Sequence, residues 1–255
     1  MEYGLIGEKL GHSYSKPIHE KLADYTYKIN PLTRDEFHNF MEARDFKAIN
    51  VTIPYKSDVI PYLDEIHENA KQIGAVNTIV NKNGKLVGYN TDYLGFLYTL
   101  VHNCIDIKGK KVIVLGNGGG AKAIIAVLND LNAKDIVIVK RRSEGGAISY
   151  EECYLSHSDA KLIINTSPVG MYPNVDERPI DVSLYKNCEA VVDIIYNPLK
   201  TKLLLQAEEL GIKAVNGLEM LVAQAKYAVE FFLEKKIDEA VIDEIYNDLL
   251  IEKSM

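Results

Sequence analysis

Strands alternate with helices along residues 111–215, and this alternation constrains the fold more than any other feature of the chain. Apolar strands that alternate with helices are typical of a parallel sheet covered on both faces. The sequence therefore predicts a doubly wound α/β unit. We expect its strands at 111–115, 135–139, 160–165, 190–194 and 214–215, and its helices at 121–131 and 201–210. Between 139 and 161 we expect a short or irregular connection.

A glycine-rich loop follows the first strand of this unit and begins its first helix. Glycines in this context allow a tight turn and let backbone N–H groups approach a pyrophosphate at the helix N-terminus. The alternative is a glycine-rich turn that binds nothing, and the position between strand and helix favours a dinucleotide. The predicted cofactor residues of the loop are Gly116, Gly118, Gly119, Gly120 and Ala121.

The second strand indicates which dinucleotide is bound. NAD binding uses an acidic residue at the end of that strand, about 20 residues after the glycines. Asp135 lies at this spacing but begins the strand, so we reject it. The strand ends instead in Lys140, Arg141 and Arg142, and guanidinium groups match a 2′-phosphate in charge and geometry. A solvated basic turn is the alternative. The pattern favours NADP over NAD.

The first hundred residues predict a second, smaller α/β domain. We expect strands at 2–7 and 48–53, a strand pair at 75–80 and 85–89, and helices at 17–25, 57–73 and 93–101. A polar linker at 106–109 then separates the domains, and the chain from 220 to 252 is helical. The fold class is therefore α/β with two domains. Residues 1–100 with 219–255 form a substrate-binding and catalytic domain, and 101–218 form the NADP-binding domain.

Lys56 lies where a strand ends at Pro54 and the expected helix over 57–73 begins. A lysine at a helix N-terminus faces the positive end of the helix dipole, which favours a lowered pKa. Such a lysine exchanges protons with a hydroxyl near neutral pH. The alternative for Lys56 alone is an ordinary solvated lysine.

Polar side chains gather at four places in the first domain, and together they suit a substrate with several hydroxyls. Asp92 is the acid among them and is expected to share a proton with Lys56. Each cluster also has a structural alternative, since asparagine and serine are common in turns and Asp92 could simply begin a helix. The clusters are His12–Ser15, Thr52 with Lys56, Asn77–Thr78, and Asn90–Asp92.

Composition excludes several function classes. The net charge of −7 provides no electrostatic footprint for nucleic acid or an anionic membrane. The three cysteines are widely spaced and lack zinc-ligand spacing, so we expect reduced thiols and no metal site. No signal peptide and no membrane-spanning apolar run are found. We expect a cytoplasmic protein that acts on a small molecule, as a monomer or homodimer.

The chain resembles the shikimate dehydrogenase family, the NADP-dependent reductases of 3-dehydroshikimate in aromatic amino acid (chorismate) biosynthesis. Ordered motifs carry the resemblance along essentially the full length. They are 12–15, 50–56, 74–78, 88–92, the glycine loop, 165–171, 193–198 and 217–224.

The resemblance implies a role for each matching residue. Lys56 and Asp92 are implied as the catalytic pair. Ile194 and Gly217 would line the nicotinamide pocket, and Arg141 would meet the 2′-phosphate. The implied substrate ligands are Ser13, Ser15, Thr52, Asn77, Tyr196 and Gln224.

Two alternatives stay open at this point. One is a quinate/shikimate dehydrogenase that uses NAD, and the basic cluster at 140–142 weighs against it. The other is a catalytically silent NADP-binding regulator, and the presence of both Lys56 and Asp92 weighs against that.

Overall fold

The computed structural model describes residues 1–11 and 13–254, and the side chains of all of these up to 252. His12, which was assigned above to the first polar cluster, lies outside the described residues. The chain divides into two compact units, Met1–Phe96 with Leu221–Met255, and Leu97–Met220. The division falls inside a helix, a few residues before the boundary expected from the sequence. Each unit is described by itself.

The first unit is built on a mixed sheet with the strand order β2-β1-β3-β5-β6-β4. Strands β1, β2 and β3 run parallel, whereas β5 is antiparallel to both β3 and β6. Its strands are β1 (Tyr3–Gly7), β2 (Tyr27–Pro31), β3 (Ala48–Val51), β4 (Glu65–Ile66), β5 (Thr78–Lys82) and β6 (Lys85–Tyr89). Its helical elements are α1 (Ser15–Leu22), α2 (Arg34–Ala43), the 3-10 turn η1 (Ile60–Tyr62), α3 (Glu68–Ile73), the first turns of α4 (Thr91–His102), most of α8 (Leu218–Leu233) and α9 (Ala240–Ser254).

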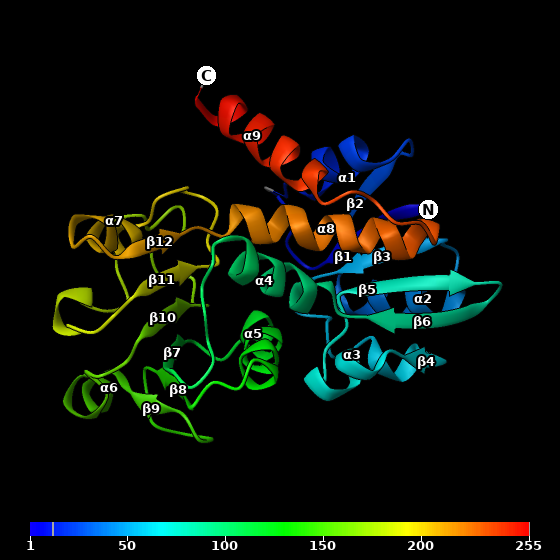
Figure 1. Ribbon diagram of the computed structural model, residues 1–255. Coiled ribbons are helices and arrows are strands. Elements are labelled where there is room, and N and C mark those ends of the chain that lie inside the picture. The colour runs from blue at the N-terminus through cyan, green and yellow to red at the C-terminus, as the bar shows by residue number, and fades with distance from the viewer. Residues whose placement is uncertain (12, 255) are drawn as a thin grey trace. The chain divides into compact units, whose positions relative to one another are not determined.

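The two faces of this sheet form separate cores, because neighbouring residues of a strand point to opposite faces. Leu5 packs with Ala228 and Phe232 of α8 on one face. The next residue, Ile6, packs with Phe37 of α2 on the other. Figure 1 shows α8 running along the sheet, with α3 near its β4 edge. The C-terminal helices therefore complete the N-terminal unit, as the sequence predicts.

The second unit has the strand order β12-β11-β10-β7-β8-β9, and each neighbouring pair is parallel. This is the Rossmann order. Successive strands are added on one side of β7 up to β9, and from β10 onward they are added on the other side. Figure 1 shows α5 on one side of the sheet, and α6 and α7 on the other. The elements are β7 (Lys111–Leu115), α5 (Gly119–Asp130), β8 (Asp135–Lys140), β9 (Ile148–Ser149), α6 (Tyr150–Ser156), β10 (Leu162–Asn165), η2 (Val182–Leu184), β11 (Ala190–Asp193), α7 (Lys202–Glu209) and β12 (Lys213–Val215). The predicted α/β class with a parallel sheet is confirmed.

The prediction of a single helix over 57–73 is wrong. The segment instead forms η1, the short strand β4 and helix α3. Pro61 disfavours the helical conformation of the residue before it. In addition, β4 pairs with β6, and Asp64 N donates to Leu86 O at 2.9 Å, so the sheet draws the segment out of a helix. Lys56 therefore lies in a turn and not at the start of the helix predicted over 57–73.

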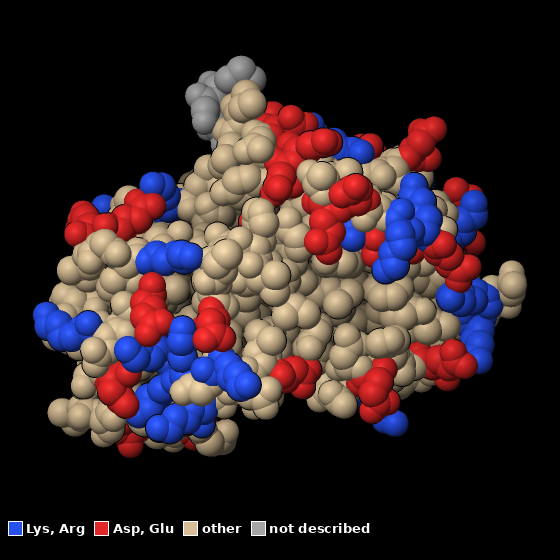
Figure 2. Space-filling model, viewed as in Figure 1, with Lys and Arg blue, Asp and Glu red and all other residues tan. Residues whose placement is uncertain are grey.

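The surface carries mixed charge, in keeping with the net charge of −7. On the face that Figure 2 shows, acidic and basic groups are interspersed over most of the surface, and basic side chains gather at the lower left, where Figure 1 places β8 and β9. Within the described part of the chain, no helix is long and apolar enough to cross a membrane.

Candidate active site

The topology of the first sheet brings the predicted polar clusters to one edge. Because β1 and β3 are parallel, the segments that follow them start at the same edge of the sheet. Because β5 is antiparallel to β3 and to β6, the start of β5 and the end of β6 lie at that edge too. Asn50 is paired with Thr78, and Thr78 with Tyr89. The segments around Ser13, Lys56, Asn77 and Asp92 therefore meet, although they are distant in sequence.

Lys56 and Asp92 form an ion pair at this edge. The Lys56 Nζ lies 2.5 Å from Asp92 Oδ2, and the two side chains are only 15% and 13% exposed. Val76 N donates to Lys56 O at 2.7 Å, which ties the turn to the segment before β5. The pairing expected from the sequence is present, but tertiary packing positions the lysine rather than a helix terminus.

Asp92 occupies the first turn of α4, where the positive end of the helix dipole favours a carboxylate. Asn90 precedes the helix, and its Oδ1 accepts a hydrogen bond from Tyr93 N at 3.2 Å. Asn90 thus caps the helix while Asp92 contacts Lys56. Residues 90–92 therefore begin a helix and also place a carboxylate against Lys56.

Asn77 is almost fully buried beside this pair. Its Oδ1 accepts hydrogen bonds from Thr91 N at 2.7 Å and from the Thr78 hydroxyl at 3.0 Å. Gln224 of α8 joins the cluster, since its Oε1 lies 3.5 Å from Thr91 Oγ1. The structure therefore brings Asn77 and Gln224 to the same threonine, as expected for residues of one site.

The segments after β1 and β3 supply the remaining predicted substrate residues of the first unit. Thr52 is half-buried, and its N donates to Ile6 O at 2.9 Å, which holds the two strand ends together. Ser15 begins α1, and its N donates to Ser13 Oγ at 3.2 Å. Tyr196, in contrast, belongs to the second unit, where it follows β11.

The glycine loop lies at the switch point between β7 and β10. Gly116 has φ +101°, and a Cβ there would lie 2.9 Å from Thr166 Oγ1, which follows β10. Gly118 precedes α5 without a side-chain capping bond, and a Cβ there would meet nothing within 4 Å. The start of α5 is therefore open at Gly118 and has no side-chain cap, which fits the pyrophosphate of a dinucleotide.

The predicted nicotinamide residues are packed against the same helix start. A Cβ on Gly217 would lie 2.0 Å from Ile194 O, so no side chain fits there. A Cβ on Gly120 would lie 3.4 Å from Ile194 Cδ1. The structure therefore brings Gly120, Ile194 and Gly217 together, while Ala121 is buried in α5.

A buried carboxylate behind Ile194 was not singled out by the sequence. Asp193 accepts hydrogen bonds from Asn165 Nδ2 at 3.0 Å, Thr201 Oγ1 at 2.8 Å and Ile195 N at 3.1 Å. Burial raises the pKa of Asp193 to about 6, against the opposing effect of these donors. The network joins the ends of β10 and β11. The motifs at 165–171 and 193–198 could have indicated this network, because they begin with Asn165 and Asp193, but no structural role was predicted for them from the sequence.

The basic cluster follows β8, next to the glycine loop. Gly116 N donates to Val139 O at 2.9 Å, so the ends of β7 and β8 are adjacent. Lys140 pairs with Glu144 at 2.8 Å, whereas Arg141 and Arg142 are exposed. Arg141 also lines a cavity of about 170 Å³ with residues of the segment 168–177. Arg141 is thus better placed than Lys140 to hold a phosphate.

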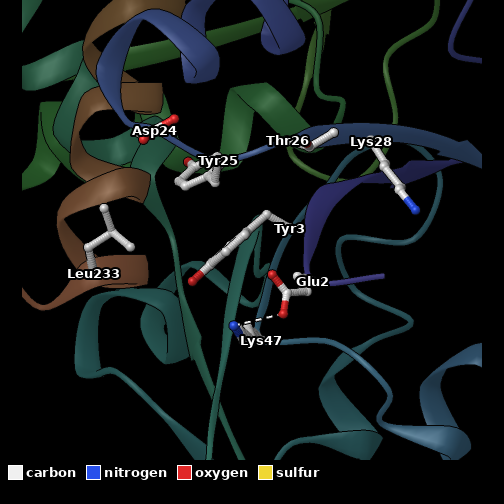
Figure 3. Close-up of a pocket in the computed structure, with 8 residues that line it drawn as sticks. All are labelled: Glu2, Tyr3, Asp24, Tyr25, Thr26, Lys28, Lys47 and Leu233. Carbon is white, nitrogen blue, oxygen red and sulfur yellow. Dashed lines mark ion pairs between the residues drawn. The ribbon is translucent and has the colours of Figure 1, made fainter.

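A larger cavity of about 560 Å³ lies elsewhere in the first unit and contains none of the predicted site residues. Figure 3 shows Tyr3 and Tyr25 in its wall and the Glu2–Lys47 ion pair across its side. The Glu2 Oε1 and Lys47 Nζ atoms are 2.8 Å apart, so two of the charged residues that line it are paired with each other. The polar sheet edge, with its partly buried Lys56–Asp92 pair, is the stronger candidate for catalysis.

A Rossmann unit with an open glycine loop, accompanied by a unit with a lysine–carboxylate pair, defines a nicotinamide-nucleotide-dependent oxidoreductase. The sequence model of a family described as "Shikimate dehydrogenase substrate binding domain" matches residues 5–79. A shikimate dehydrogenase (NADP(+)) of Clostridium beijerinckii is 41% identical over 262 residues, covering 96% of each protein. The chain belongs to the shikimate dehydrogenase family.

Solved structures agree with this assignment. The shikimate 5-dehydrogenase of Thermus thermophilus, in complex with NADP(H) and shikimate, superposes with a TM-score of 0.86 at 26% identity, covering 97% of this chain and 99% of that one. A quinate dehydrogenase of Corynebacterium glutamicum, in complex with NAD, superposes with a TM-score of 0.87 at 26% identity, covering 98% of each chain. The backbone alone therefore does not distinguish the two substrates.

Proposed function

We propose that this protein reversibly reduces 3-dehydroshikimate to shikimate with NADPH, a step of aromatic amino acid (chorismate) biosynthesis. The observation that carries the proposal is the partly buried Lys56–Asp92 ion pair at a polar sheet edge, in a chain that belongs to this family. The first unit would bind shikimate and the second NADP.

Lys56 is the proton donor for the substrate carbonyl oxygen. The hydride for the carbonyl carbon comes from NADPH when that cofactor is bound. As negative charge develops on the oxygen, the Lys56 ammonium stabilises it and transfers a proton to it. Asp92 holds the ammonium through the 2.5 Å contact and so fixes where the proton points. In the reverse direction Lys56 accepts the hydroxyl proton.

The other polar residues bind and orient the substrate. Asn77 and Gln224 lie around Thr91, one residue before the acid of the pair. Ser13, Ser15 and Thr52 follow the parallel strands β1 and β3 at the same edge. Hydroxyl and amide groups suit the hydroxyls and carboxylate of shikimate. Tyr196 of the second unit is proposed as a further substrate ligand.

The second unit holds NADP through its backbone and one basic side chain. Backbone N–H groups at the start of α5 would bind the pyrophosphate, because no side chain caps the helix and the space at Gly118 is open. Ile194 and Gly217 would form the wall of the nicotinamide pocket. Arg141, with Lys140 and Arg142 beside it, would bind the 2′-phosphate and so favour NADP over NAD.

The proposal includes a cytoplasmic location and a monomeric or homodimeric assembly, without nucleic acid or membrane partners. Cys104, Cys153 and Cys188 are free thiols, which supports a reducing compartment. Light scattering on the purified protein measures the assembly, and a larger particle than a dimer would contradict it.

The test is the steady-state reduction of NADP⁺ with shikimate, beside NAD⁺ with quinate. We expect a higher kcat/KM for the NADP⁺–shikimate pair. A higher value for NAD⁺ with quinate would establish the alternative quinate/shikimate dehydrogenase. Binding of both NADP⁺ and shikimate without turnover would establish the silent regulator.

A further inference from the structure

A line of buried hydrogen bonds runs from Tyr27 in β2 to Asn77 at the candidate active site. The Tyr27 hydroxyl donates to Asn50 Oδ1 at 2.7 Å. Asn50 Nδ2 donates to Asn77 O at 3.2 Å and to Thr78 Oγ1 at 3.1 Å. The Thr78 hydroxyl then donates to Asn77 Oδ1 at 3.0 Å. None of these four residues is more than 5% exposed.

Tyr27 fixes the direction in which the hydrogen bonds of this line are donated. Burial raises the pKa of Tyr27 well above its ordinary value of 10, so the phenol keeps its proton and donates it. The acceptor is Asn50 Oδ1, which leaves the amide NH₂ of Asn50 facing Asn77 and Thr78. A reversed Asn50 amide would place its oxygen against the Asn77 carbonyl oxygen, and two acceptors repel each other.

The orientation of the Asn77 amide follows from this direction. The Thr78 hydroxyl receives a hydrogen bond from Asn50, so its own proton points to an acceptor, either Asn77 Oδ1 at 3.0 Å or Thr91 Oγ1 at 3.1 Å. Thr91 N donates to the same oxygen at 2.7 Å. Asn77 Nδ2 donates to none of the described residues. The Asn77 amide nitrogen, which is a hydrogen-bond donor, is therefore the side-chain atom that remains available to a ligand.

We propose that Tyr27, Asn50 and Thr78 are positioning residues that hold Asn77 with its amide nitrogen available to the substrate. The site then selects an oxygen acceptor of the substrate, a hydroxyl or carbonyl oxygen, at the position that Asn77 contacts. This inference rests on the proposed function, because shikimate is the ligand used to test it. The three positioning residues act through Asn77 and contact no substrate themselves.

The test compares Tyr27→Phe and Thr78→Val with a matched control, Tyr55→Phe. Tyr55 is also a fully buried tyrosine of the first unit, and its hydroxyl donates to Leu32 O at 2.7 Å, away from the line. Tyr27→Phe and Tyr55→Phe each remove one buried hydrogen bond of equal length. A merely structural role predicts the same outcome for both.

The readouts are the Kd values of shikimate and NADP⁺ by titration calorimetry, together with kcat and KM. We expect Tyr27→Phe and Thr78→Val to raise the Kd and KM of shikimate by about tenfold, in line with one weakened polar contact. The Kd of NADP⁺ should stay within about twofold, and kcat should fall less than kcat/KM. Tyr55→Phe should leave the Kd of shikimate at the wild-type value.

A shikimate Kd in Tyr27→Phe that equals the Tyr55→Phe value would overturn the inference. Tyr27→Phe alone decides the matter if Thr78→Val does not fold. A wild type that neither binds nor oxidises shikimate would refute the proposed function instead. Neutron diffraction on that protein would then still decide the inference, since a deuterated amide of Asn50 facing Tyr27 contradicts it and one facing Asn77 supports it.

Discussion

Asp193→Asn gives a sharp test of the electrostatics behind the proposed nicotinamide wall. Asp193 is fully buried at the end of β11, one residue before Ile194. Asparagine has the same shape and cannot ionise. The substitution therefore removes a buried charge while it retains an oxygen that can accept from Ile195 N and Asn165 Nδ2.

The size of the effect follows from the raised pKa of Asp193. An acid whose pKa is higher in the folded state stabilises the fold below its unfolded pKa of 3.8, and this stability is lost as the pH rises through about 6. At about 1.4 kcal/mol per pH unit, the rise from 3.8 to about 6 corresponds to about 3 kcal/mol. The variant does not lose this stability. Part of the loss has already occurred at pH 4, so its unfolding free energy relative to wild type should increase by about 2.4 kcal/mol between pH 4 and pH 7.

The assay is urea unfolding followed by circular dichroism at several pH values from 4 to 8. Asp181→Asn is the matched control, because hydrogen bonds from Ser183 and Gln206 lower the pKa of Asp181 against a small burial effect. Wild type loses the stability that Asp181 contributes as the pH falls. The unfolding free energy of Asp181→Asn relative to wild type should therefore decrease, not increase, between pH 4 and pH 7. A difference between Asp193→Asn and wild type that stays constant from pH 4 to pH 7 would refute the reasoning.

Three further substitutions test the second unit. Gly217→Ala should cost several kcal/mol of unfolding free energy or prevent folding, because its Cβ would lie 2.0 Å from Ile194 O; thermal unfolding measures this, and a stability near wild type would contradict the packing. Gly118→Ala meets no atom within 4 Å, so its stability should stay within about 1 kcal/mol of wild type. In a fluorescence titration the same variant should bind NADP⁺ about tenfold more weakly, and unchanged affinity would argue against a pyrophosphate at this loop. Arg141→Ala should raise the KM of NADP⁺ at least about tenfold and leave that of NAD⁺ within about twofold, and an equal change in both would exclude a 2′-phosphate contact.

Much of the second unit could be predicted from the sequence because its signals are local. Its strands are continuous apolar runs, and β7 was predicted with the bounds that the structure has. The glycine loop can also be recognised locally, because a strand precedes it and a helix follows it. What sequence did not indicate is the close approach of Gly217 to Ile194, since residues 23 positions apart meet only after β11 and β12 pair.

The first unit was harder to predict because tertiary pairing outweighs local periodicity there. Apolar spacing suggested one helix over 57–73, but pairing of β4 with β6 overrides it. Strand β2 and helix α2 were not predicted, although Thr33 and Glu36 form a capping box that the sequence signals. Lys56 was singled out because a helix was expected directly after it, and that reason is wrong, whereas its expected pairing with Asp92 is present.

The polar site could be assembled from the sequence only in part. Motif order suggested that Asn77 and Asp92 share a site, and the antiparallel pairing of β5 with β6 brings the segments that hold them to one edge of the sheet. The line from Tyr27 through Asn50 could not be predicted, because its members belong to strands whose register no local pattern gives. Residues that bind directly are thus easier to recognise than those that hold them in place.

The central claim is that Lys56 carries the proton chemistry, and Lys56→Ala tests it most directly. The measurement is kcat for NADP⁺ reduction at saturating shikimate, with the Kd of shikimate determined on the same protein. The matched control is Lys71→Ala, an exposed lysine of the first unit. The account predicts that kcat of Lys56→Ala falls about a thousandfold while shikimate still binds and Lys71→Ala keeps wild-type turnover. A folded Lys56→Ala protein with kcat close to wild type would contradict it.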